Sequence, residues 1–152
     1  MLGGGAIPVG QPARNTGYAT RLAGAVGISS VAAAIVLAGG GEHDLAIGMW
    51  IVIAARAAAA IPHVRVQIAR ALGRPAQLWH SDVAQGLAVI VTAVAWISDL
   101  VPFAPVVVMA VIAVFNVAAV RRAPRPAKVL GFQQMAFGFS LVAVTAAAVA
   151  LA

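Results

Sequence analysis

Long apolar runs dominate this sequence, and they constrain its fold more than any other feature. Each run comes close to the ~17–25 residues that a helix needs to cross the hydrocarbon core of a bilayer. Hydrophobic residues make up 62% of the 152 residues and charged residues only 9%, which is not the composition of a soluble domain. The sequence therefore predicts an all-α fold, a polytopic bundle of about five transmembrane helices. The helices are expected near residues 22–39, 45–72, 83–98, 101–120 and 130–152.

Residues that break helices lie between these runs. Residues 1–13 are rich in Gly and Pro and are expected to form a flexible tail, followed by a single membrane domain over residues 14–152. The first run exceeds the usual ~7–15 apolar residues of a signal peptide, so we expect a retained helix. Whether the second helix continues through Pro62 stays open, because proline removes one backbone hydrogen bond. The breakers are Gly39 to Gly41, Gly73, Pro75, Asp99, Pro102, Pro124 and Pro126.

Charged residues alternate in sign from one gap to the next. Glu42, Asp44 and Asp99 lie in gaps that hold no Lys or Arg. If every run spans the membrane, nine of the ten Lys and Arg residues fall on the other side. The positive-inside rule then predicts a multi-pass protein of the cell membrane with a cytoplasmic N terminus and an outer C terminus. The nine basic residues are Arg14, Arg21, Arg65, Arg70, Arg74, Arg121, Arg122, Arg125 and Lys128.

The formal charge of +6 is distributed over these gaps rather than gathered into one patch. A nucleic-acid partner is therefore not expected. The chain contains no cysteine, which excludes thiolate ligands, thiol nucleophiles and disulfides. A functional site has to be built from other side chains.

The segment ARAAAAIPHVRVQIARALGRP, residues 55–75, places polar residues at regular intervals in an apolar stretch. An α-helix turns by 100° per residue, so residues three, four or seven positions apart share one face. Arg65 would lie on the face opposite to Arg56. If the helix continues past Pro62, the pattern predicts a polar stripe along one side. The stripe consists of Arg56, His63, Gln67, Arg70 and Arg74.

Two interpretations of this stripe stay open. In the first, Arg56 extends its long side chain to the inner headgroups, about 9 Å away, and there is no site. In the second, the stripe lines a cytoplasm-facing cavity for an anion, such as a lipid phosphate or a diphosphate headgroup, because guanidinium groups hold such oxygens in a bidentate fork. Other polar residues expected near this space are Asp82, Gln85, Asn116, Gln133 and Gln134. Each of these alone more often forms a hydrogen bond between helices.

Metal and haem sites are not expected. His43 falls on the outer side of the predicted topology, which leaves His63 and His80 on the inner side. Two histidines without a set of carboxylates are a poor metal signature. No nucleotide-binding or nucleophile motif appears in the chain. We therefore predict no cofactor and favour a non-catalytic protein over an enzyme.

Two segments, RAAAAIPHVRVQIARALGRP and FNVAAVRRAPRPAKVLGFQQMAFGFSLV, resemble the YwiC-like family of bacterial integral membrane proteins. The likeness lies in a helix that ends in a basic segment and, later, in an Arg-rich turn, Lys128, Gly131 and a polar pair that leads into a final helix. It extends from about Arg14 to the end of the chain. Family members are usually longer and carry an N-terminal block with a His-Gly-Ala-Trp signature, so this chain is similar to their C-terminal part.

The resemblance implies a membrane fold and no established activity. The layout is also similar to prenyltransferases of the UbiA type, which hold a diphosphate with Mg²⁺ and Asp-rich cytoplasmic motifs. Here Asp82 is the sole acidic residue on the predicted cytoplasmic side, too little for such a site. We expect a non-catalytic subunit or lipid-binding module that works with membrane lipid and with another membrane protein chain or further copies of itself. The alternative is a membrane enzyme or transporter of an amphipathic anion, such as a prenyl diphosphate or phospholipid.

Overall fold

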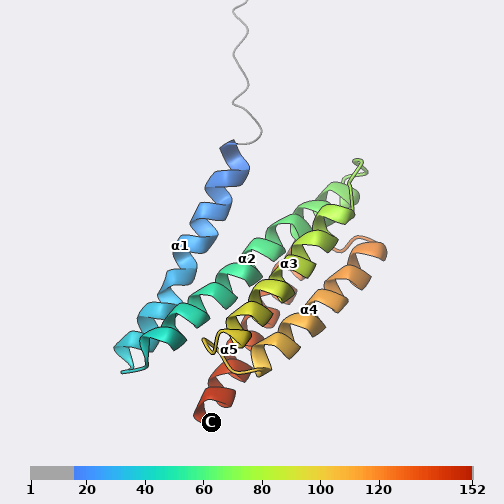
Figure 1. The fold of residues 1–152 in the computed structure, drawn as a ribbon. Helices are drawn as coiled ribbons and strands as arrows, with labels where there is room; N and C mark the ends of the chain where they lie inside the picture. Colours follow the sequence, from blue (N-terminus) through green and yellow to red (C-terminus); the bar gives the residue numbers. More distant parts are fainter. Residues whose placement is uncertain (1–15, 152) are drawn as a thin grey trace, which may run out of the picture.

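The computed structural model describes residues 16–151, and over this range it consists of helices and short connections (Figure 1). The predicted all-α bundle is confirmed. The expected tail, residues 1–13, and the basic Arg14 lie outside the described residues, as does the side chain of Arg21. The helices are α1 (Thr16–Ala38), α2 (His43–Ala71), α3 (Trp79–Ile97), α4 (Ala104–Arg121) and α5 (Ala127–Ala150).

Among the described helices, the four from α2 to α5 are long and apolar enough to cross a membrane. The apolar part of α1, Leu22–Ala38, is shorter. These lengths and compositions make the chain a multi-pass membrane protein.

The five described helices begin two to six residues from the predicted starts, and the largest difference is at α1, which begins at Thr16 rather than at residue 22. α3 begins at Trp79, before the predicted residue 83, because its first turn includes polar residues such as Asp82, whose charge is favourable at a helix N terminus. α4 begins at Ala104, after Pro102, and Pro105 lies in its first turn, where a missing N–H leaves no bond unmade. Apolar runs therefore mark the spans, whereas capping and turn residues mark the helix ends.

The longest helix, α2, continues through Pro62 and ends at Ala71, which answers the question that the sequence left open. At 1.5 Å per residue, it is about 43 Å long. Its end is closed by Gly73, which has a φ of +65°, and by hydrogen bonds from Gly73 N to Arg70 O at 3.0 Å and from Arg74 N to Ala69 O at 2.9 Å. Because glycine adopts this left-handed conformation readily, the helix stops there. Arg74 consequently lies in the turn and not on the helix.

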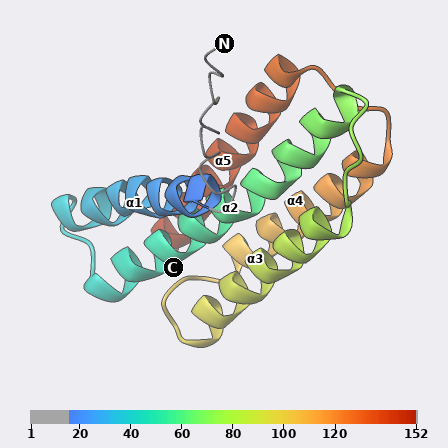
Figure 2. The ribbon, with the colours of Figure 1, turned by 90° about the horizontal axis from the view of Figure 1, so that it is seen from above.

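The bundle is organised around α2, which contacts each of the other described helices. In Figure 2, α1 and α3 lie on opposite sides of α2. α1 packs against α2 alone among the described helices, and Trp50 Nε1 donates to Val26 O across that contact at 3.1 Å. α4 packs against α2, α3 and α5. α2 is therefore the element whose side chains can reach every part of the bundle.

Small residues allow the helices to approach closely. Gly48 of α2 packs against the turn between α3 and α4, where a Cβ would collide with the main-chain oxygen of Leu100. α5 is sparsely enclosed, since Leu130, Leu141 and Thr145 are its buried residues. The apolar core consists of Val52, Ala59, Ala88, Ala95, Val101, Met109 and Leu141.

Candidate functional site

The polar stripe of α2 faces the interior of the bundle. Arg56 is 5% exposed, and His63 and Gln67 are fully buried. Arg70 is half-buried near the end of the helix, whereas Arg65 on the opposite face is exposed. The spacing of these residues thus brings a cation and two neutral polar groups onto a buried face of α2 that is otherwise apolar.

The guanidinium of Arg56 contacts α5. Its Nη2 donates to Oε1 of Gln134, and its Cζ lies 5.9 Å from the centre of the Phe137 ring, a distance at which a cation and an aromatic face attract each other. Its Nε is buried and has no hydrogen-bond partner among residues 16–151. The side chain therefore turns into the bundle and does not extend to the headgroups, which favours the second interpretation of the stripe.

A chain of amide side chains continues from Arg56 across the bundle. Gln134 Nε2 donates to Asn116 Oδ1 at 3.4 Å, and Asn116 Nδ2 donates to Gln85 Oε1 at 3.2 Å. Gln85 Nε2 donates to Ala59 O at 3.0 Å, so the chain of hydrogen bonds begins and ends on α2. Gln85 and Asn116 are buried. These contacts link α2, α3, α4 and α5 through neutral groups.

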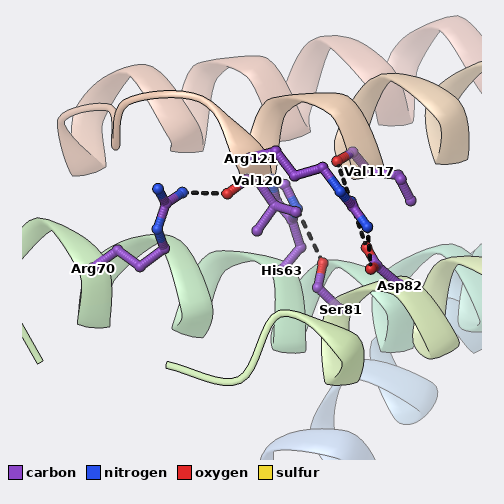
Figure 3. A network of polar contacts seen from close by, with 7 residues as sticks. All are labelled: His63, Arg70, Ser81, Asp82, Val117, Val120 and Arg121. Carbon is purple, nitrogen blue, oxygen red and sulfur yellow. Dashed lines mark hydrogen bonds and ion pairs between the residues drawn. The ribbon is translucent and has the colours of Figure 1, made fainter. Parts of the chain in front are cut away.

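His63 contacts α3 rather than the amide chain. Its Nδ1 lies 3.3 Å from Ser81 Oγ (Figure 3), and its Nε2 has no partner. The pair has the spacing of a nucleophile and its base. However, both residues are fully buried, and no third group orients the imidazole, so the arrangement lacks the access and the alignment that nucleophilic catalysis needs.

Gln67 and Arg70, the last two stripe residues on α2, donate hydrogen bonds to the main chain at the C-terminal end of α4. Gln67 Nε2 donates to Ala119 O at 3.1 Å. Arg70 Nη1 donates to the main-chain oxygen of Val120 (Figure 3) and to that of Arg122 at 2.9 Å. The last carbonyl groups of a helix have no partner within the helix, and these side chains supply one. Gln67 and Arg70 are therefore largely structural, although Gln67 Oε1 remains buried without a partner.

Asp82 and Gln133, which were expected near the same space, pair with basic residues at one end of the bundle. Asp82 forms an ion pair with Arg121 at 2.7 Å (Figure 3). Gln133 Oε1 accepts a hydrogen bond from Arg125 Nη1 at 2.7 Å. Arg74 is exposed in the turn after α2. Of the predicted residues, the structure thus brings Gln85, Asn116 and Gln134 to Arg56 and leaves Asp82, Gln133 and Arg74 apart from it. 

Two contacts of this site were not anticipated from the sequence. Ser81 forms a hydrogen bond with His63, and the ring of Phe137 lies beside the guanidinium of Arg56. Phe137 follows Gln134 by three positions, the spacing of neighbours on one helix face, so this contact follows once α5 is known to face Arg56. Ser81 immediately precedes Asp82 in a stretch that hydropathy does not assign to a helix.

The charge of Arg56 is not balanced by the part of the chain that the structure describes. The four acidic residues of the chain are Glu42, Asp44, Asp82 and Asp99, and Arg56 forms no ion pair with any of them among residues 16–151. Buried charges in proteins are generally paired, because an isolated one is strongly destabilising. Arg56 thus combines a buried positive charge with a free donor.

Other features of the described residues do not form an alternative site. Among them, no group of three or more His, Cys, Asp or Glu side chains is placed to hold a metal ion. A pocket of about 250 Å³ lies between α2, α3 and the turn after α3, and it is lined by Ile51, Ile90, Val91, Val94, Ala95, Ser98 and Leu100. None of the stripe residues lines that pocket. Arg56 and its neighbours remain the candidate site.

No family model, curated protein or solved structure matches this chain. The resemblance to the YwiC-like family therefore stays a prediction that rests on the two segments quoted above.

Proposed function

We propose that this chain is a non-catalytic membrane protein that binds the anionic group of a membrane amphiphile at Arg56. In this proposal the protein lies in the bacterial inner membrane with its N terminus in the cytoplasm and its C terminus outside. The alternation of basic and acidic gaps supports this orientation.

The observation that carries the proposal is the buried, unneutralised guanidinium of Arg56. Desolvation of an ion costs on the order of several kcal/mol unless a counter-charge and hydrogen bonds offset it. Within a membrane helix such a cation usually marks a functional site when its side chain faces the bundle. Arg56 faces Gln134 and Phe137, so a neutral acceptor and an aromatic face are its present partners. An anionic ligand would supply the missing charge.

The chemistry of the neighbours supports binding rather than catalysis. Gln134, Asn116 and Gln85 are amides, which neither ionise near neutral pH nor act as nucleophiles. The amides also hold four helices in register, so the site is held in place by the surrounding bundle.

The resemblance to the YwiC-like family leads us to propose, in addition, a second membrane protein chain as a partner. Purification of the tagged protein in mild detergent, followed by mass spectrometry of copurifying proteins, tests this part. A preparation that retains lipid while monomeric and free of other proteins would contradict it.

Lipid retention tests the anion site directly. We expect Arg56→Leu to reduce anionic lipid per protein by about tenfold, the effect of losing one charge-assisted contact. Arg56→Lys should retain an intermediate amount, because an ammonium keeps the charge but cannot form the planar fork. Arg65→Leu is the matched control, since it removes a cation from the exposed face of the same helix. Native mass spectrometry of equally folded variants provides the measurement, and equal retention in wild type and Arg56→Leu would overturn the proposal.

A further inference from the structure

We infer that the amide of Gln134 occupies the position of the ligand's anionic group, and that this group is a singly charged oxyanion with two available oxygens. A carboxylate or a phosphodiester on an apolar chain meets this description. The inference rests on the proposed function and specifies the ligand class and the residue that competes with it.

One of the two donors on the ligand-facing edge of the Arg56 guanidinium has an acceptor, and the other has none. In arginine, Nε and Nη2 lie on the same edge and form a fork for two oxygens. Nη2 of Arg56 donates to Gln134, whereas Nε is buried without a partner. An amide has one acceptor oxygen, so it fills one position of the fork and leaves the other open. An oxyanion with two oxygens would fill both.

The contact that holds Gln134 in place is weak enough to be exchanged. Its second hydrogen bond, from Nε2 to Asn116 Oδ1, is 3.4 Å long, near the limit for such a bond. The hydrogen bond from Arg56 to Gln134 is charged on the donor side alone, whereas an oxyanion would also supply the missing counter-charge. An oxyanion therefore displaces the amide oxygen from Arg56 at a net gain.

The number of charges around the site sets the charge of the ligand. Arg56 is one cation, and its neighbours in the hydrogen-bonded chain, Gln134, Asn116 and Gln85, are neutral. A second negative charge on the ligand would be buried without a partner, which is strongly unfavourable. The site therefore favours a carboxylate or a phosphodiester over a prenyl diphosphate.

The position of α5 supplies a route for an apolar chain. α5 carries Gln134 and is sparsely enclosed, with Leu130, Leu141 and Thr145 as its buried residues. Phe137 lies on the same helix, one turn from Gln134 and beside Arg56. A ligand held at Arg56 can thus extend its apolar part along Phe137 into the surrounding lipid.

Gln134→Glu tests the inference, because it places a carboxylate within the protein at the position that we assign to the ligand. We expect Gln134→Glu to reduce retained anionic lipid about tenfold, as in Arg56→Leu, and to raise the unfolding temperature, since the arginine gains its counter-charge. Gln133→Glu is the matched control. It introduces the same charge one residue earlier, where the side chain faces Arg125, and should retain lipid like the wild type. Retention by Gln134→Glu at the wild-type level would overturn the inference.

A second variant covers the case in which the glutamate disturbs folding. Gln134→Ala removes the competing amide oxygen but keeps Arg56, so it should retain at least as much anionic lipid as the wild type. A loss as large as that in Arg56→Leu would show that Gln134 binds the ligand instead of competing with it, and would overturn the inference. If Arg56→Leu itself retains lipid normally, the proposed function fails. If Arg56→Leu loses lipid and Gln134→Glu does not, the function stands and the inference fails.

Reconstitution into bilayers of phosphatidylcholine distinguishes the sources of the anion. Binding is measured with oleate, phosphatidylglycerol and farnesyl diphosphate as separate probes. We expect oleate or phosphatidylglycerol to bind in an Arg56-dependent manner and farnesyl diphosphate to bind more weakly. Tighter binding of farnesyl diphosphate would overturn the assignment of a single charge. A second outcome would overturn lipid as the ligand. In it, the wild type binds no lipid but copurifies with an acidic membrane protein, and Arg56→Leu loses that protein.

Discussion

Arg70 of α2 donates a hydrogen bond from Nη1 to the main-chain oxygen of Arg122, 2.9 Å away, just beyond the last residue of α4. The same nitrogen also donates to the oxygen of Val120. A cation is favourable at a helix C terminus, where the carbonyl groups carry partial negative charge. The arginine thus joins the ends of two helices that are adjacent in space and separated by α3 in the chain.

Arg70→Met should therefore destabilise the protein. We expect a loss of about 1–3 kcal/mol in the free energy of unfolding, the range for charge-assisted hydrogen bonds and unpaired carbonyl groups. Arg74→Met is the control, because Arg74 is exposed in the turn after α2. Unfolding in detergent, followed by circular dichroism, provides the measurement. Equal stability of the two variants would show that the contact of Arg70 contributes little.

Asn116 should be among the most sensitive polar positions of the core. It accepts from Gln134 and donates to Gln85, and it is fully buried. Asn116→Leu leaves Gln85 Oε1 without a donor, which we expect to cost about 1–3 kcal/mol of unfolding free energy. Replacing Gln85 by Leu as well should recover part of this loss, because both polar partners are then absent. A double mutant that is as unstable as the sum of the single mutants would argue against a coupled pair.

Ser81→Ala should separate a structural role from a chemical one. Removal of the hydroxyl leaves Nδ1 of His63 without its partner, and we expect a loss of about 1 kcal/mol in unfolding free energy. Lipid retention should be unchanged, since the hydrogen-bonded chain from Arg56 runs through Gln134, Asn116 and Gln85 and does not include Ser81. A selective loss of retained lipid at unchanged stability would show instead that Ser81 belongs to the site.

The proposed orientation can be mapped with single cysteines, because the chain has none of its own. Cysteines at Gln77 and Ala127 should be protected from an impermeant thiol reagent in intact cells, whereas one at His43 should react. All three positions are exposed. The neighbouring Gly41 is a poor choice, since a Cβ there would lie 2.6 Å from Val36 Cγ1. Labelling of all three sites in intact cells would contradict the orientation.

The inward face of α2 could be predicted from spacing alone, because Arg56, His63 and Gln67 recur at intervals of a helical turn or two. The place where the stripe ends could not. Arg74 has the right spacing, but the positive φ of Gly73 ends the helix before it. Helical periodicity describes a face only as far as the helix extends, and the end depends on local backbone conformation.

The partner of Arg56 was also beyond prediction from one sequence. Gln133 and Gln134 are adjacent and identical in chemistry, and the rotation of α5 decides which of them meets α2. In the structure Gln134 faces Arg56 and Gln133 faces Arg125. The choice between an arginine that extends to the headgroups and one that turns inward depends on this packing. It therefore requires the tertiary structure.

The wide separation in sequence between Arg56 and Gln134 has a consequence for the synthesis of the protein. The two residues are 78 positions apart, and at about 5–20 residues per second the ribosome needs roughly 4–16 s to pass from one to the other. During that interval α2 has left the ribosome with a cation that has no partner from α5. An unaided α2 is thus a poor substrate for lateral release into lipid. We expect it to stay beside the insertion machinery until α5 arrives, so that α5 completes the integration of α2.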